Sequence, residues 1–165
     1  MQELRKMSNE IQLRTTVNGI KYKLMVPTRL LASDFLRDSL NLTGTHVGCE
    51  HGICGSCTIK IDGLTARSCL KFAVQLDGKQ VETIESFQKK KDTKNILEKF
   101  KANHSLQCGF CTPGFLMIID ELLKNKIKYS DNEIREALSG NLCRCTGYEN
   151  IVKAAKQVLG SKRVK

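Results

Sequence analysis

The 165-residue sequence contains no tryptophan and only three tyrosines and six phenylalanines, so aromatic side chains are scarce. Proteins that bind single-stranded nucleic acid stack the bases on aromatic side chains. The scarcity of aromatic residues therefore argues against a protein of this class. Long apolar runs are also lacking. The longest unbroken run spans Phe115 to Ile119, far short of a membrane-spanning helix. We therefore predict no nucleic-acid partner and no membrane segment.

The first residues, Met1 to Lys6, lack the apolar stretch of a secretory signal peptide. We therefore expect the protein to be cytoplasmic, where thiols stay reduced. This expectation bears on the eight cysteines of the sequence, because disulfides need an oxidising compartment. Metal-bound thiolates are the better interpretation of these cysteines.

The formal net charge is +10, and most of the excess of lysine and arginine lies in residues 86–165. A basic half of this kind could bind nucleic acid or dock on an acidic partner. A solvated linker and an exposed helix surface would give the same composition. The charge by itself does not choose between these interpretations.

Four cysteines in the first half have the spacing C-x4-C-x2-C, with a fourth after eleven further residues. They are Cys49, Cys54, Cys57 and Cys69. This is the plant-type pattern of a [2Fe–2S] cluster held by four thiolates. Gly48, Gly52 and Gly55 allow tight turns and a close approach of the backbone. Zinc is the alternative, but zinc sites favour two C-x2-C pairs and only one is present here.

The other four cysteines form a C-x2-C pair and a C-x-C pair: Cys108, Cys111, Cys143 and Cys145. Thr112-Pro113 follows the first pair and Thr146-Gly147 the second. Both pairs are therefore predicted at helix N-termini, where the helix dipole favours an anion. We predict a second [2Fe–2S] cluster here, with zinc as the alternative. His51 forms half of a Rieske motif with Cys49, but the sequence has no matching C-x2-H.

The first 85 residues are predicted to form an α+β domain. Asn18-Gly19 joins two β-rich runs, 11–17 and 20–26, which is a strong hairpin signal. Apolar residues at helical spacing predict an amphipathic helix over 29–40. Three further strands are expected, at 57–61, 64–68 and 81–84.

Residues 86–92 are predicted as a linker and residues 93–160 as a helical domain. Helices are expected at 95–102, 113–125, 132–138 and 147–159. Ser130 with Glu133, and Thr146 with Glu149, fit the capping box at the start of the last two helices. Domains this small have limited cores, so bound metal would contribute to their stability.

Together these residues resemble the small [2Fe–2S] iron–sulfur subunit of the molybdenum hydroxylases, the family that includes xanthine oxidase, aldehyde oxidoreductase and carbon monoxide dehydrogenase. The likeness covers roughly residues 10–160. The matching stretches are 44–58, 67–69, 107–114 and 141–148.

The resemblance implies a β-grasp, plant-type ferredoxin-like domain over residues 8–85 and a four-helix bundle over 93–160, each binding one cluster. Electrons would leave a molybdopterin (molybdenum) centre in a large subunit and pass through the bundle cluster to the ferredoxin cluster. They would then reach FAD in a medium subunit. The three chains would form a heterotrimer that could itself dimerise. Gln107 and Cys145 are expected to approach the pterin.

On this interpretation the chain is the electron-relay subunit of an oxidoreductase, and no catalytic acid, base or nucleophile is predicted in it. The substrate would be a small molecule oxidised elsewhere in the complex, and an aldehyde is favoured. Two other classes stay open. A stand-alone ferredoxin should present an acidic docking face, which this basic chain lacks. A zinc-stabilised nucleic-acid-binding protein is favoured only by the charge of +10.

Overall fold

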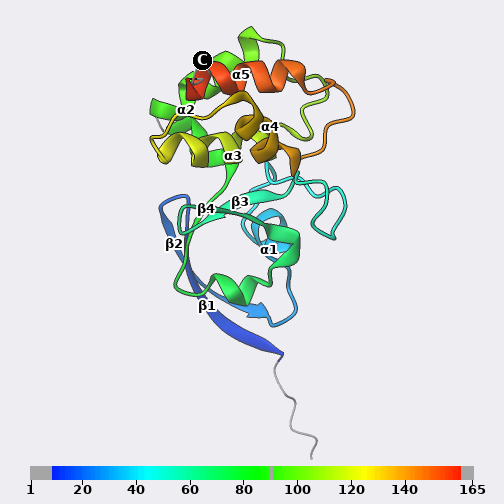
Figure 1. Cartoon of the computed structure of the whole chain (residues 1–165). Coiled ribbons are helices and arrows are strands. Elements are labelled where there is room, and N and C mark those ends of the chain that lie inside the picture. The colour runs from blue at the N-terminus through cyan, green and yellow to red at the C-terminus, as the bar shows by residue number, and fades with distance from the viewer. Residues whose placement is uncertain (1–8, 90, 161–165) are drawn as a thin grey trace, which may run out of the picture.

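The computed structural model describes residues 9–89 and 91–160 and has a mixed α+β architecture, as predicted (Figure 1). A five-stranded sheet is formed by the N-terminal half, and a group of helices lies at one end of it. Each half encloses a hydrophobic core of its own. Within the described residues, no helix combines the length and the apolar character needed to span a bilayer.

The sheet has the strand order β2-β1-β5-β3-β4. Its strands are β1 (Glu10–Val17), β2 (Ile20–Pro27), β3 (Thr58–Ile61), β4 (Leu64–Arg67) and β5 (Gln80–Glu82). β1 and β2 form the predicted hairpin, and Asn18 and Gly19 both have positive φ, 51° and 83°, as a type I′ turn requires. β5 runs parallel to β1 and antiparallel to β3, and so joins the two hairpins into one sheet.

The helix predicted over 29–40 is shorter and less regular than expected. α1 covers only Ala32–Asp34, and a π-helical turn, Phe35–Ser39, continues it. Leu31 is extended, with φ −70° and ψ 149°, and forms a β-bridge with Phe72. This long-range pairing delays the start of the helix. The apolar pattern located the segment that packs on the sheet but not its bounds.

The helical half consists of α2 (Lys91–Ala102), α3 (Thr112–Lys124), α4 (Asp131–Ser139) and α5 (Glu149–Leu159). α2 begins inside the predicted linker, and a 3-10 helix, Ile84–Lys89, precedes it. The capping box predicted for α4 is confirmed. Ser130 Oγ accepts from the Glu133 N–H at 3.3 Å, and the Glu133 carboxylate accepts from the Ser130 N–H at 2.6 Å. The bounds of the two domains stay a prediction.

The capping box predicted for α5 is wrong. The residue before this helix is Tyr148, whose φ of 69° lies in the left-handed region and whose side chain makes no cap. The Thr146 hydroxyl contacts the Cys143 sulfur instead, and Glu149 forms an ion pair with an arginine of α4. The C-x-C pair therefore lies in the loop ahead of α5 and not at its N-terminus.

A buried ion pair joins the sheet to the helices. Lys60 on β3 is fully buried and donates to Asp120 on α3, which is 2% exposed. Glu82 on β5 lies 2.8 Å from the same ammonium, and Lys124 lies 3.6 Å from each of these two carboxylates. Burial opposes the charge on Lys60, but the two carboxylates outweigh it and raise the pKa of this ammonium. Buried charges persist when they are paired, so this cluster links the two halves.

We expect the substitution Asp120→Ala to lower the free energy of unfolding by about 3 kcal/mol, because Lys60 would lose its closest buried carboxylate. Asp131→Ala is the matched control, since its ion pair with Lys156 is partly exposed, and it should cost less than about 1 kcal/mol. Chemical denaturation of the full chain, followed by circular dichroism, measures both values. Equal effects of the two substitutions would contradict the linking role of the buried pair.

Candidate iron–sulfur sites

The β3–β4 hairpin and the loop before it bring the first four cysteines together. Cys57 directly precedes β3, and Cys69 lies in a short 3-10 helix just beyond β4. The antiparallel register of the hairpin places these two residues side by side, and their Sγ atoms are 3.4 Å apart. Cys49 and Cys54 come from the loop, where the Cys54 N–H donates to Cys49 Sγ at 3.4 Å.

The thiols of this first set differ in acidity. The backbone N–H groups of Cys54 and His51 lower the pKa of Cys49 to about 6. Burial, together with contact with Cys57, raises the pKa of Cys69 to about 11. A buried thiol of the second kind loses its proton when a metal supplies positive charge beside it.

The second four cysteines form an inner pair and an outer pair. Cys111, the N-cap residue of α3, is buried, and Cys143 beside it is half-buried. Cys108 and Cys145 are exposed, and their Sγ atoms lie 3.5 Å apart. Burial and contact with Cys143 raise the pKa of Cys111 to about 12, whereas the Phe110 N–H lowers the pKa of Cys108. The inner thiols are therefore shielded, and the outer ones face solvent.

The sulfur geometry fits metal clusters better than disulfides. All eight thiols are free, and contacts of 3.4 and 3.5 Å exceed the roughly 2.05 Å of an S–S bond. A [2Fe–2S] core is held by four thiolates, two on each iron, which suits sulfurs gathered in pairs. A Cβ at Gly48 would lie 3.3 Å from Cys54 Sγ, so glycine leaves room beside the first set. Among the described residues, no three His, Cys, Asp or Glu side chains converge as ligands of a single ion.

Two histidines hydrogen-bond to carbonyl groups of the cysteine loops. His51 Nδ1 contacts the carbonyl oxygen of Cys49 within its own loop. The His46 ring stacks on Phe110 with centroids 4.8 Å apart, and its Nδ1 lies 2.8 Å from the Phe110 carbonyl oxygen. His46 thus ties the loop of the first set to the loop that holds Cys108.

The two cysteine loops also touch through their backbones. The Leu142 N–H, next to the C-x-C pair, donates to the Cys54 carbonyl at 2.9 Å. Asn141 is fully buried at this contact, between Gly55 and Gly114. A Cβ would come within 2.0 Å of the Asn141 side chain at Gly55 and within 2.2 Å at Gly114. The close approach therefore requires glycine at both positions.

Asn141 and Gly114 are two residues of this contact for which the sequence predicts no role. Gly114 could have predicted this contact. Glycine in the first turn of a helix is unfavourable and indicates a close approach of another chain segment. Asn141 gave no such indication, since a polar residue next to a helix end is ordinarily an exposed loop residue. Its burial depends on the first cysteine loop, which is remote in sequence.

The two residues predicted to approach a pterin lie at the exposed end of the second set. Gln107 is exposed and directly precedes Cys108, whose sulfur contacts that of Cys145. Gln107 and Cys145 lie far apart in the sequence. The loop before α5 brings Cys145 close to the segment that contains Gln107. Both residues are exposed, and their approach to a pterin stays a prediction.

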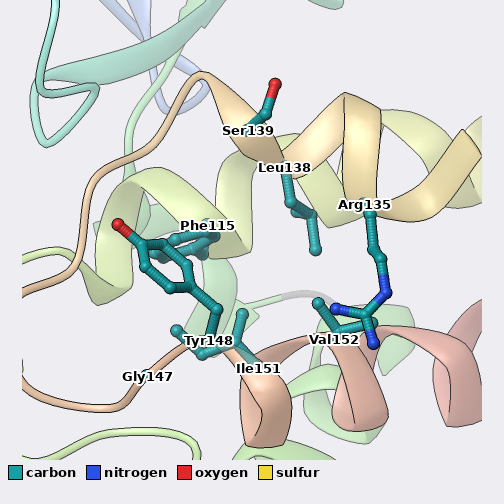
Figure 2. Close-up of a pocket in the computed structure, with 8 residues that line it drawn as sticks. All are labelled: Phe115, Arg135, Leu138, Ser139, Gly147, Tyr148, Ile151 and Val152. Atoms are coloured by element: carbon teal, nitrogen blue, oxygen red, sulfur yellow. The ribbon is translucent and has the colours of Figure 1, made fainter. Parts of the chain in front are cut away.

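An apolar hollow of about 430 Å³ lies beside the second set (Figure 2). Its lining consists of Phe115, Arg135, Leu138, Ser139, Gly147, Tyr148, Ile151 and Val152. Tyr148 connects the hollow to the cysteines, because its phenol oxygen accepts from the Cys143 N–H at 3.0 Å. Arg135, on the other side of the hollow in Figure 2, donates to Glu149 at 2.9 Å.

Two family profiles match the chain. The first, described as a 2Fe-2S iron-sulfur cluster binding domain, covers residues 37–104 and with them the first four cysteines. The second, described as a [2Fe-2S] binding domain, covers residues 83–156 and with them the other four.

Characterised relatives extend this match over most of the chain. The gamma subunit of caffeine dehydrogenase from Pseudomonas sp. (strain CBB1) is 53% identical and covers 87% of each chain. The nicotine 6-hydroxylase small subunit of Paenarthrobacter nicotinovorans is 46% identical over 93% of this chain and 92% of its own. A chain in the crystal structure of quinoline 2-oxidoreductase from Pseudomonas putida 86 is 45% identical. It superposes with a TM-score of 0.83 over 90% of this chain and 91% of its own.

The chain belongs to the family of small iron–sulfur subunits of the molybdenum hydroxylases. The predicted resemblance is thereby confirmed, and with it the role of an electron-transfer subunit in an oxidoreductase. The relatives are named as subunits of larger enzymes, so a small iron–sulfur subunit works together with partner subunits. Its own two domains are [2Fe–2S] cluster binding domains.

In this small iron–sulfur subunit, Cys54→Ser should remove the EPR signal of one cluster and spare the other, because Cys111 and Cys143 of the second set belong to the core of the helical half and no cysteine of the first set does. His51→Ala is the control in the same loop, since its Nδ1 contacts a carbonyl oxygen, and it should keep both signals. EPR of the dithionite-reduced chain, combined with iron analysis, distinguishes these outcomes. Loss of both signals in Cys54→Ser would show that the sites are not independent.

Proposed function

We propose that this chain relays electrons through two [2Fe–2S] clusters, from a large molybdopterin-binding subunit to a medium FAD-binding subunit. The ligands of one cluster would be Cys49, Cys54, Cys57 and Cys69, and those of the other Cys108, Cys111, Cys143 and Cys145. Each cluster would carry one electron at a time. The sheet with its short helix supports a β-grasp ferredoxin-like domain over 8–85, and α2 to α5 support a four-helix bundle over 93–160.

The hydrogen bond from the Leu142 N–H to the Cys54 carbonyl is the observation that carries this proposal. At 2.9 Å it joins the residue beside Cys143 to a residue of the first set. Cys143 belongs to the inner pair of the second set, whereas Cys108 and Cys145 are exposed. A bonded route therefore leads from the exposed pair, past the inner pair, to the first set. The route connects the two sites, and the resemblance to the family supplies the direction, with entry of electrons at the second site and exit from the first.

Exposed apolar side chains near both sites support two separate partner surfaces. Ile53 and Leu70, 60% and 57% exposed, belong to the segments that hold the first set. Leu106 and Phe110, 44% and 45% exposed, flank Cys108. Apolar side chains left exposed beside a site are candidates for protein–protein contact. We assign the second surface, with Gln107 beside it, to the large subunit and the first to the medium subunit, in a heterotrimer that could itself dimerise.

The substrate class of the complex is proposed from the relatives. Caffeine, nicotine and quinoline, which name the three similar enzymes, all contain a nitrogen heterocycle. We therefore propose a nitrogen heterocycle as the substrate of the complex. The aldehyde favoured from the sequence stays a prediction, because the relatives named aldehyde oxidoreductase are less similar, at 38% and 34% identity. The cytoplasm, expected from the sequence, stays the proposed compartment.

Spin-quantified EPR on the anaerobically purified, dithionite-reduced chain tests the proposed function. Two distinct S = 1/2 signals, together about two spins per chain, are expected from two [2Fe–2S] centres. A silent spectrum from protein that contains zinc and no iron would overturn the proposal. The basic, zinc-stabilised nucleic-acid-binding protein would then be the better description.

We expect Cys143→Ser to stop the transfer of electrons from substrate to the flavin in the assembled complex, because Cys143 lies on the bonded route between the two sites. Reduction of the flavin by an added chemical reductant should be unchanged. Ser139→Ala is the control, since its hydroxyl bonds to the Glu136 carbonyl and not to a sulfur. Stopped-flow absorbance of the flavin measures both reactions. Substrate-dependent flavin reduction that survives in Cys143→Ser would show that the order of carriers is wrong.

A further inference from the structure

The loop between Cys143 and α5 folds back onto Cys143. Thr146 Oγ1 lies 3.1 Å from Cys143 Sγ, and the Thr146 N–H points at the same sulfur from 3.4 Å. Tyr148 closes the loop by accepting the Cys143 N–H on its phenol oxygen at 3.0 Å. Gly147 and Tyr148 both have positive φ, 67° and 69°, and this conformation is strained for a tyrosine. The strained turn places the Thr146 hydroxyl against the sulfur.

The surrounding hydrogen bonds decide the direction in which this hydroxyl donates. A threonine hydroxyl has one proton to donate and lone pairs with which to accept. The Tyr148 N–H already donates to Thr146 Oγ1 at 3.2 Å. Cys143 as a cluster ligand is a thiolate, which has no proton and only accepts. The Thr146 proton is therefore directed at the Cys143 sulfur.

We propose that Thr146 raises the reduction potential of the second [2Fe–2S] site through the hydrogen bond from its hydroxyl to the Cys143 sulfur. This inference rests on the proposed function, which makes Cys143 a ligand. Reduction adds one electron, supplied by the molybdenum subunit, and increases the negative charge on the ligand sulfurs. A hydrogen bond to a more negative acceptor is stronger, so the reduced form gains more than the oxidised form. Thr146 acts through Cys143 and is a positioning residue.

The surroundings of Cys143 make this hydrogen bond effective. Cys143 is half-buried and belongs to the inner pair, where screening by water is weaker than at the exposed Cys108 and Cys145. In the first set, by contrast, backbone N–H groups such as that of Cys54 donate to Cys49 Sγ. A backbone donor is independent of side-chain identity, whereas the donor on Thr146 can be removed by substitution.

Thr112 provides a matched control within the same site. It is also a threonine and directly follows the cysteine of the inner pair on α3, Cys111. Its Oγ1 is buried and has no hydrogen-bond partner among the described residues. The substitution Thr112→Val therefore changes a hydroxyl to a methyl group next to the second set without removing a donor to a sulfur.

An EPR-monitored redox titration of the iron-loaded full chain tests the inference. Thr146→Val keeps the shape and the N–H but removes the hydroxyl. It should lower the equilibrium constant for reducing the second site about tenfold, which is about 59 mV for one electron. Thr146→Ser restores the donor and should match the wild type, as should Thr112→Val. The first site serves as the internal reference and should not shift.

An unchanged potential in Thr146→Val, or an equal shift in Thr112→Val, would overturn the inference. If Thr146→Val takes up no second cluster, a measurement on the wild-type chain tests the hydrogen bond instead. Pulsed electron–nuclear double resonance in H₂O and D₂O should reveal a rapidly exchanging proton coupled to the reduced second site, and its absence would overturn the inference as well. Failure of the proposed function looks different, because no [2Fe–2S] signal would then be present in any variant.

Discussion

The buried contact between Lys60 and Asp120 is the interaction on which the placement of the two cysteine loops depends. β3, which carries Lys60, begins directly after Cys57, and α3, which carries Asp120, begins directly after Cys111. An ion pair between these two elements therefore holds a segment of each cysteine set in place relative to the other. A buried charge without its partner is strongly destabilising. The pair therefore favours the arrangement of the two halves in which Lys60 and Asp120 are in contact.

Within that arrangement, the contact between the loops is made by backbone and not by large side chains. Gly55 and Gly114 leave no space for a Cβ beside Asn141, and the Leu142 N–H reaches the Cys54 carbonyl directly. A relay of electrons benefits from a short route of covalent and hydrogen bonds, and small residues make such a route shorter than packed apolar side chains would.

Folding and metal binding are coupled in this chain through the acidity of its thiols. Each set combines a thiol that ionises readily with one that burial keeps protonated, such as Cys49 with a pKa of about 6 and Cys69 with a pKa of about 11. Bringing all four thiolates of a set together releases protons and requires the positive charge of the metal. A cluster held by these thiolates would therefore stabilise a small domain whose own core is limited.

Features that depend on neighbours along the chain were predictable from the sequence, because their physical cause lies within a few residues. These include the two cysteine sets, the Asn18-Gly19 hairpin and the capping box at Ser130. Features that depend on remote residues were not. Leu31 is extended because it pairs with Phe72. The Thr146 hydroxyl contacts the Cys143 sulfur and does not cap α5. The sequence by itself thus determined the chemistry of this protein, two sets of four thiols in an electron-transfer subunit. Only the tertiary structure decided which sulfurs are buried, which hydroxyl contacts them and where the two loops meet. These properties arise from contacts between segments such as β3 and α3 that lie far apart in the chain.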